Sequence, residues 1–297
     1  MASATMRTGE IPGAMTARPD DEEIDLFGIT HPGKVRKDNQ DHYLIGTVHQ
    51  SVVVHGSSLP NIDELPRRGR RLGTFALVAD GVGGSADGSE AARLAAETVM
   101  RYVSSTLQCY NAASDTTTDQ FLEALRAAAL QAHDAVRAEN ATRASGRMAT
   151  TLTFTFSVWP WMYVVQLGDS RCYFYLNGKL QQITRDQTVA QMLFEQGALK
   201  REDVERSPLK NVLASAVGGD EALPEVTRVN LTNRSAATLL CSDGLTKHVS
   251  AQEIEEHIRN AISAEQVCRD LLQLALDRGG SDNITILVGR APVRVPG

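Results

Sequence analysis

The stretch ALVADGVGGSADG (residues 76–88) places the strictest limit on how this chain can fold. Residues 75–79 are apolar and predict a buried strand that stops at Asp80-Gly81, before a Gly- and Ser-rich loop and an alanine-rich helix. Packing fixes the backbone of such a strand, so the Asp80 carboxylate is held firmly at a sheet edge. Asp-Gly is also a common hairpin-turn dipeptide, and one such site does not decide between the two interpretations.

Strands and helix pairs alternate along the rest of the chain. Two long helices in succession, over residues 88–107 and 119–140, exclude a plain repeat of strand, helix and strand. Asp87 has capping-box spacing to Glu90 and is the predicted N-cap of the first. Two further capped helices start near Ser250 and Ser263. The predicted fold is therefore α+β, with two packed antiparallel sheets and helix pairs outside them. The predicted strands lie at 24–30, 42–48, 75–79, 149–184 (several), 225–231, 236–241 and 284–290.

Three stretches do not fit this regular pattern. Residues 1–23 are small, polar and acidic and predict a disordered tail, which leaves 24–292 as a single domain. Residues 185–224 are charged and irregular, and we expect a flap-like insertion over the sheet edge. Residues 49–72 predict a long polar loop, whose arginines, among them Arg71, are either solvated charges or a docking patch.

Composition excludes several classes of protein. The hydrophobic and charged contents, 42% and 22%, are ordinary for a globular domain, and the formal net charge of −6 argues against nucleic acid as a partner. Four cysteines without a CxxC pair favour a reducing compartment. No segment has the apolar length of a signal sequence or membrane span. We therefore expect a cytoplasmic protein that binds neither nucleic acid nor membrane.

Four aspartates occupy equivalent places in this pattern. Asp80, Asp169 and Asp243 come just after predicted strands, and Asp282 comes just before one. If the strands are neighbours, the carboxylates converge on one rim, where their pKa values would rise unless a cation neutralises them. Oxygen ligands select Mg²⁺ or Mn²⁺ over zinc, and the seven histidines form no HExxH pair. Asp169 alternatively fits a simple turn residue within Gly168-Asp169-Ser170.

Two such ions can share and activate a water that attacks a phosphoryl group. Arg36 precedes a predicted strand, and its planar fork suits phosphate, although a single arginine more commonly sits exposed as a surface charge. These residues lie in an ordered set of motifs that resembles the metal-dependent protein phosphatase 2C (PPM) family over roughly residues 24–290. The motifs are RKDNQD (36–41), VADGVGG (78–84), ATT (149–151), LGDSR (167–171), SDGL (242–245) and SDNIT (281–285); TRDQT and LKNVL within 184–213 resemble the flap of bacterial members.

The resemblance implies a four-layer α-β-β-α sandwich with two Mn²⁺ or Mg²⁺ ions at the sheet ends. By position, Asp80 would bridge both metals and the Gly81 carbonyl would bind the second. Asp243 and Asp282 would bind the first, and Asp169 with Asp243 would form the third metal site of bacterial relatives. The implied activity is hydrolysis of phosphoserine and phosphothreonine in proteins, by direct attack of a metal-bridging hydroxide.

Two catalytic roles and two departures complete the comparison with the family. Asp41 would hold metal-bound water, and Arg36 would bind the substrate phosphate. Gln40 replaces a glutamate of many members, which removes one charge beside the metals and predicts weaker metal binding. Val82 stands where animal members have a histidine proposed as general acid, so a metal-bound water must protonate the leaving group.

Alternatives to a broadly acting signalling phosphatase stay open. A catalytically weak or inactive member would serve as a regulatory module that binds phosphoproteins, but every metal-binding aspartate is present. An active enzyme could instead serve one regulatory phosphoprotein, such as an anti-sigma antagonist, rather than substrates of Ser/Thr kinases in general.

Overall fold

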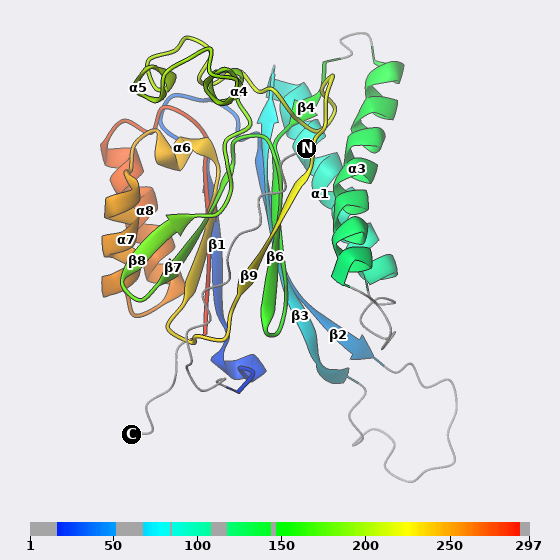
Figure 1. Ribbon diagram of the computed structural model, residues 1–297, viewed down its shortest axis with the longest axis vertical. Coiled ribbons are helices and arrows are strands. Elements are labelled where there is room, and N and C mark those ends of the chain that lie inside the picture. The colour runs from blue at the N-terminus through cyan, green and yellow to red at the C-terminus, as the bar shows by residue number, and fades with distance from the viewer. Residues whose placement is uncertain (1–16, 52–67, 84, 108–117, 144–146, 292–297) are drawn as a thin grey trace.

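The chain folds into two antiparallel sheets packed face to face, with a pair of helices on each outer face (Figure 1). This computed structural model describes residues 17–51, 68–83, 85–107, 118–143 and 147–291. The arrangement confirms the predicted α+β fold and its four layers.

Each sheet mixes strands from distant parts of the chain. The first has the order β1 (Asp25–His31), β11 (Ile284–Arg290), β10 (Ala237–Cys241), β7 (Arg171–Leu176) and β8 (Lys179–Gln182). The second has the order β2 (Asp41–Ser51), β3 (Arg68–Val82), β5 (Leu152–Val158), β6 (Trp161–Leu167) and β9 (Glu225–Asn230), and β4 (Ala149–Thr150) pairs with β3. Asn177 and Gly178 both have positive φ, as the type I′ hairpin turn between β7 and β8 requires.

Helices α1 (Ser85–Tyr102) and α3 (Thr118–Thr142) cover the second sheet. A π-helical turn, Val103–Leu107, follows α1. The structure starts α1 before Asp87, so Asp87 lies in the first helical turn and its prediction as the N-cap is wrong. An acidic side chain there still favours the helix, because the N-terminal end of the helix dipole is positive. The two predicted apolar stripes are buried: Ala92, Ala95, Val99 and Val103; and Phe121, Leu125, Ala129, Ala132 and Val136.

Helices α7 (Ala251–Asn260) and α8 (Ala264–Asp277) cover the first sheet. Both begin as predicted, because the side chain of Ser250 accepts a hydrogen bond from the Glu253 amide and that of Ser263 accepts one from Gln266. None of the helices in the described ranges is both long and apolar enough to cross a membrane.

A third, smaller apolar layer lies between the sheets. It is formed by side chains from strands of both sheets: Val78, Met162, Val164, Cys172, Phe174, Leu240 and Leu287. Strands β3 and β10 are therefore buried on both faces, which explains why residues 75–79 form an unbroken apolar run rather than an alternating one. This double packing fixes the strand ends that carry the predicted site.

The predicted loop over residues 49–72 is too long. Strand β2 continues to Ser51 and β3 begins at Arg68, so only 52–67 remain between them, outside the described residues. Register shifts on either side of His49 interrupt the pairing of β2 with β3. Most residues in this outer part of the two strands are polar, so the sequence shows no alternation of apolar and polar residues there. Arg71 is also not a solvated charge: it is 4% exposed, donates to the Pro19 carbonyl and pairs with Asp21.

The other two irregular stretches, the N-terminal segment and the insertion, both have ordered parts. Of the predicted disordered tail, residues 1–16 lie outside the described part, but Asp21–Glu23 form a 3-10 helix and Glu23 pairs with Arg234 at 2.8 Å. The insertion, 185–224, contains two short helices, α4 (Val189–Glu195) and α5 (Arg201–Val204). Figure 1 shows both at the same end of the sheets as α6 (Asp243–Thr246).

The leucines of the chain offer a matched test of this packing. Leu125 in α3 is fully buried, whereas Leu223 in the insertion is 62% exposed. We expect Leu125→Ala to lower the free energy of unfolding by about 2–5 kcal/mol, because it leaves a cavity in the core. Leu223→Ala should change it by less than about 0.5 kcal/mol. Urea denaturation followed by circular dichroism measures both, and equal effects would contradict the packing described.

Candidate active site

Asp41 and Asp80 form the centre of the site. Asp41 is the first residue of β2 and lies directly opposite Asp80 near the end of β3. Residues opposite one another across an antiparallel pair project from the same face of the sheet, so the two carboxylates are neighbours. The backbone of Asp80 is held by Thr151, whose hydroxyl accepts from the Asp80 amide and whose amide donates to the Asp80 carbonyl.

Asp41 is buried and only half satisfied. Its Oδ2 accepts hydrogen bonds of 2.7 Å from the hydroxyls of Ser242 and Thr285, while its Oδ1 is buried and has no partner among the described residues. Burial raises the pKa of Asp41 to about 6, and the two hydroxyls limit the rise. A buried carboxylate oxygen without a donor is an available acceptor for a cation or for water bound to one.

The other predicted aspartates come from both sheets. Asp243 follows β10 and Asp282 precedes β11 in the first sheet, and Asp169 lies in the turn that leaves β6 of the second. Desolvation, followed by the charges of Asp41 and Asp243, raises the pKa of Asp80 well above its ordinary value; Asp169 and Asp282 contribute in the same direction. The structure therefore brings the five predicted aspartates together as one acidic cluster across the ends of the two sheets.

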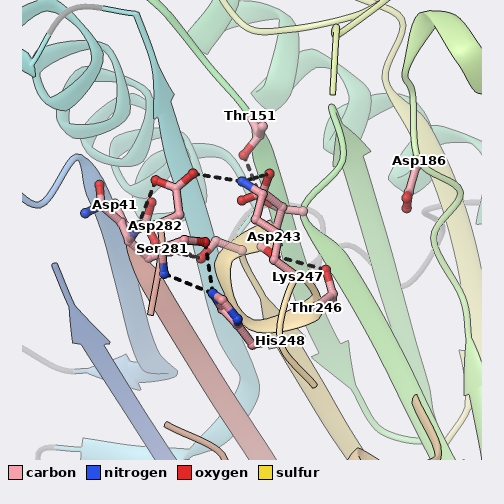
Figure 2. Close-up of polar contacts among 12 residues, drawn as sticks. Asp41, Thr151, Asp186, Asp243, Thr246, Lys247, His248, Ser281 and Asp282 are labelled. Atoms are coloured by element: carbon pink, nitrogen blue, oxygen red, sulfur yellow. Dashed lines mark hydrogen bonds and ion pairs between the residues drawn. The ribbon is translucent and has the colours of Figure 1, made fainter. Parts of the chain in front are cut away.

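Two cationic side chains bind this cluster at its outer side. Arg36 donates from Nε and Nη2 to the two oxygens of Asp282, at 2.8 and 3.1 Å. Lys247 Nζ lies 2.6 Å from Asp243 Oδ2 and 2.8 Å from Asp282 Oδ2 (Figure 2). Burial works to raise the pKa of Asp282, but the hydrogen bonds from Arg36 and Lys247 outweigh it and lower the pKa.

The residue types suit a hard divalent cation. Asp80, Asp243 and Asp282 offer only oxygen ligands, which Mg²⁺ and Mn²⁺ prefer, and no donor in the described part of the chain reaches Asp41 Oδ1. Over the described ranges, however, no three acidic, histidine or cysteine side chains stand at the spacing of a finished metal site. Asp243 and Asp282 are bound to Lys247 and Arg36 instead. The cluster fits the ions by chemistry, and two of its carboxylates have cationic partners that an ion must replace.

Gly81 follows Asp80 in β3 and pairs with Thr150 of β4. A Cβ atom at this position would lie 2.3 Å from the carbonyl oxygen of Gly88, at the start of α1, so only glycine fits. Metal binding by the Gly81 carbonyl stays a prediction.

Asp169 lies in a turn, as one of the two interpretations made from the sequence predicts, and its role in metal binding stays a prediction. It directly follows Gly168, which has a φ of 102°, and the charge of Asp243 in the cluster acts on its carboxyl group. Burial, then the charges of Asp243 and Asp186, raise the pKa of Asp169 to about 7. The insertion is fastened to this turn, because the Gln187 side chain accepts from the Gly168 amide and the Gln187 amide donates to the Gly168 carbonyl.

Asn283 was not predicted as a site residue. It is 5% exposed, accepts from the Gln40 amide, and donates to the carbonyls of Pro32 and Asp38, each at 2.9 Å. These bonds hold the loop that carries Arg36 against the start of β11. The only signal in the sequence is its place directly after Asp282.

Ser242, Thr285 and Lys247 were also missed as individual residues. Ser242 and Thr285 lie within quoted motifs, beside or near the predicted aspartates, where small polar residues are common in turns. Lys247 has ordinary helical spacing to Asp243, and its second partner, Asp282, is distant in sequence. Only the fold shows that these side chains meet the cluster.

Known proteins share both this sequence pattern and this fold. The sequence model of the family described as Protein phosphatase 2C matches residues 55–282, more than half of the chain. The serine/threonine protein phosphatase PstP of Mycobacterium tuberculosis is 37% identical over 141 residues, which are 48% of this chain and 27% of PstP. The serine/threonine phosphatase Stp of Listeria monocytogenes is 33% identical over 141 residues, which are 48% of this chain and 56% of Stp.

The solved structures include the catalytic domain of the serine/threonine protein phosphatase PstP in complex with two manganese ions. It superposes with a TM-score of 0.69 at 26% identity, covering 91% of this chain and 99% of the other. The sequence matches span about a quarter of PstP and about half of the Listeria monocytogenes phosphatase. Because the family pattern covers most of the sequence and the solved fold covers nearly all of it, this chain belongs to the protein phosphatase 2C family.

Proposed function

We propose that this chain is a metal-dependent protein phosphatase that hydrolyses phosphoserine and phosphothreonine. The observation that carries the proposal is the opposed pair Asp41 and Asp80, joined by Asp243 and Asp282 from the other sheet, with Arg36 at the edge of the cluster. A concentration of negative charge at one end of a sandwich is costly unless it serves to bind cations. The manganese ions bound by the PstP catalytic domain support this interpretation.

The ions would be manganese or magnesium, two per site. Asp80 would bridge them, Asp243 and Asp282 would bind the first, and the Gly81 carbonyl would bind the second. Asp169 with Asp243 offers a further site for a third ion. When bound, the pair of ions would lower the pKa of a shared water and so supply the hydroxide for direct attack on phosphorus.

The chain itself supplies orientation and charge. Asp41 accepts hydrogen bonds from Ser242 and Thr285 on one oxygen, which leaves Oδ1 to orient a water beside the ions. Arg36 has a side chain that is 56% exposed, so its planar fork can exchange Asp282 for the phosphate of a substrate. Val82 is 39% exposed and its side chain has no acidic proton, so we expect a metal-bound water to protonate the leaving alkoxide.

The substrates would be proteins phosphorylated by Ser/Thr kinases, in a cytoplasmic signalling pathway. The names of the relatives, serine/threonine phosphatases, support this class. A phosphopeptide panel distinguishes broad activity from selection of one regulatory phosphoprotein. Binding of phosphopeptides without Mn²⁺-dependent hydrolysis by the wild type would instead indicate a regulatory binding module.

Removal of the bridging carboxylate tests the metal role. We expect Asp80→Asn to reduce the Mn²⁺-dependent hydrolysis of p-nitrophenyl phosphate by about 100-fold or more, because metal binding supplies several kcal/mol of stabilisation. Steady-state rates at saturating Mn²⁺ measure the loss, and circular dichroism checks the fold. Asp134→Asn, at an exposed position of α3, is the matched control. A rate near that of the wild type for Asp80→Asn would refute the assignment.

Removal of Arg36 tests the phosphate role. We expect Arg36→Ala to raise KM about 10-fold and to change kcat much less, because the guanidinium contacts phosphate and does not generate the nucleophile. Kinetics with a phosphothreonine peptide at saturating Mn²⁺ separate the two constants. Arg137→Ala, at an exposed position of α3, should leave both unchanged. An unaltered KM in Arg36→Ala would remove Arg36 from the binding site.

A further inference from the structure

Lys247 joins two carboxylates that the proposed function assigns to metal binding. Its Nζ lies 2.6 Å from Asp243 Oδ2 and 2.8 Å from Asp282 Oδ2. Figure 2 shows these two aspartates and Lys247 gathered at one point between α6 and the start of β11. A single ammonium therefore links a residue that follows β10 to one that precedes β11.

Local structure fixes the position of this ammonium. Asp243 begins α6, and the Lys247 amide donates to the Asp243 carbonyl, so the two side chains lie on the same face of a helical turn. An isolated ion pair of this kind on the surface of a helix contributes little to the free energy of unfolding. Here the lysine side chain is only 29% exposed and has a second carboxylate partner from another element. The contact is thus part of the acidic cluster rather than an ordinary pair on a helix surface.

The ammonium and a divalent ion would compete for the same two carboxylates. Each Oδ2 that Lys247 binds belongs to a carboxylate proposed to hold the first ion, and a cation at that place would repel a nearby ammonium. Lys247 also acts on the third carboxylate of this region: burial raises the pKa of Asp169 to about 7, and the ammonium works in the opposite direction. Its charge therefore acts on Asp169 as well as on Asp243 and Asp282.

We propose that Lys247 is a built-in cation of the carboxylate cluster, which stabilises the metal-free protein and competes with divalent ions for Asp243 and Asp282. This inference rests on the proposed function. It predicts that the chain binds Mn²⁺ more weakly than the same carboxylates would bind it without the Lys247 charge. Metal loading, and hence activity, should therefore depend on the metal concentration. It also predicts that the metal-free protein keeps its fold.

The test measures metal affinity directly in the full chain. Lys247→Met keeps the length of the side chain and removes its charge, and Lys247→Arg keeps the charge. After removal of metal with EDTA and exchange into metal-free buffer, isothermal calorimetry with Mn²⁺ should give a Kd about 10-fold lower for Lys247→Met. Lys247→Arg should bind much as the wild type does. Lys210→Met, at an exposed position of the insertion, is the matched control.

A second measurement separates competition from a general structural effect. In EDTA, Lys247→Met should have a lower Tm than the wild type, because its carboxylates have lost a counter-ion; saturating Mn²⁺ should abolish or reverse the difference. Equal Mn²⁺ affinity in Lys247→Met and the wild type, or weaker affinity in the variant, would overturn the inference and leave the proposed function standing. Failure of every form to bind Mn²⁺ would overturn the proposed function, and the inference with it.

Discussion

Repulsion among carboxylates at the shared end of two sheets is the constraint on which this structure depends. Asp41 and Asp80 are opposed across one strand pair, and Asp243 and Asp282 approach from the other sheet. Such an arrangement persists only because apolar packing on both faces of β3 and β10 holds the strand ends in place. The favourable packing of the core thus offsets the electrostatic repulsion within the cluster.

The cluster meets this repulsion in different ways at different depths. Asp41, at the buried centre, is held by the neutral hydroxyls of Ser242 and Thr285. Asp282, nearer the solvent, is bound by the charged groups of Arg36 and Lys247. The difference follows from solvation, since hydroxyls are cheaper to bury than long cationic side chains. Arg36 and Lys247, at 56% and 29% exposed, lie nearer the solvent than the centre of the cluster, which suits the part of a site where ions and substrate must enter.

The fold was predictable because its main signals are local. Helical periodicity placed the buried stripes of α1 and α3, and the serine caps located α7 and α8. Asp80, Asp169, Asp243 and Asp282 were identified because each stands just after or just before a predicted strand, whereas Asp41 was identified only through the resemblance to the PPM family. The extensions of β2 and β3 were missed because they pair through polar residues with shifted register, and burial of Arg71 depends on contacts with the distant N-terminal segment. Lys247 was missed because its second partner, Asp282, is distant in sequence, and Asn283 because the loop that it holds is distant.

The thin apolar layer between the sheets has a consequence of its own. Since Asp41 and Asp80 belong to one sheet and Asp243 and Asp282 to the other, any sliding of one sheet over the other alters the separation between the two halves of the site. Side chains such as Val78, Leu240 and Leu287 act as an alignment layer in this respect. A change of shape among them can shift the spacing at the distant rim while leaving every acidic side chain chemically intact.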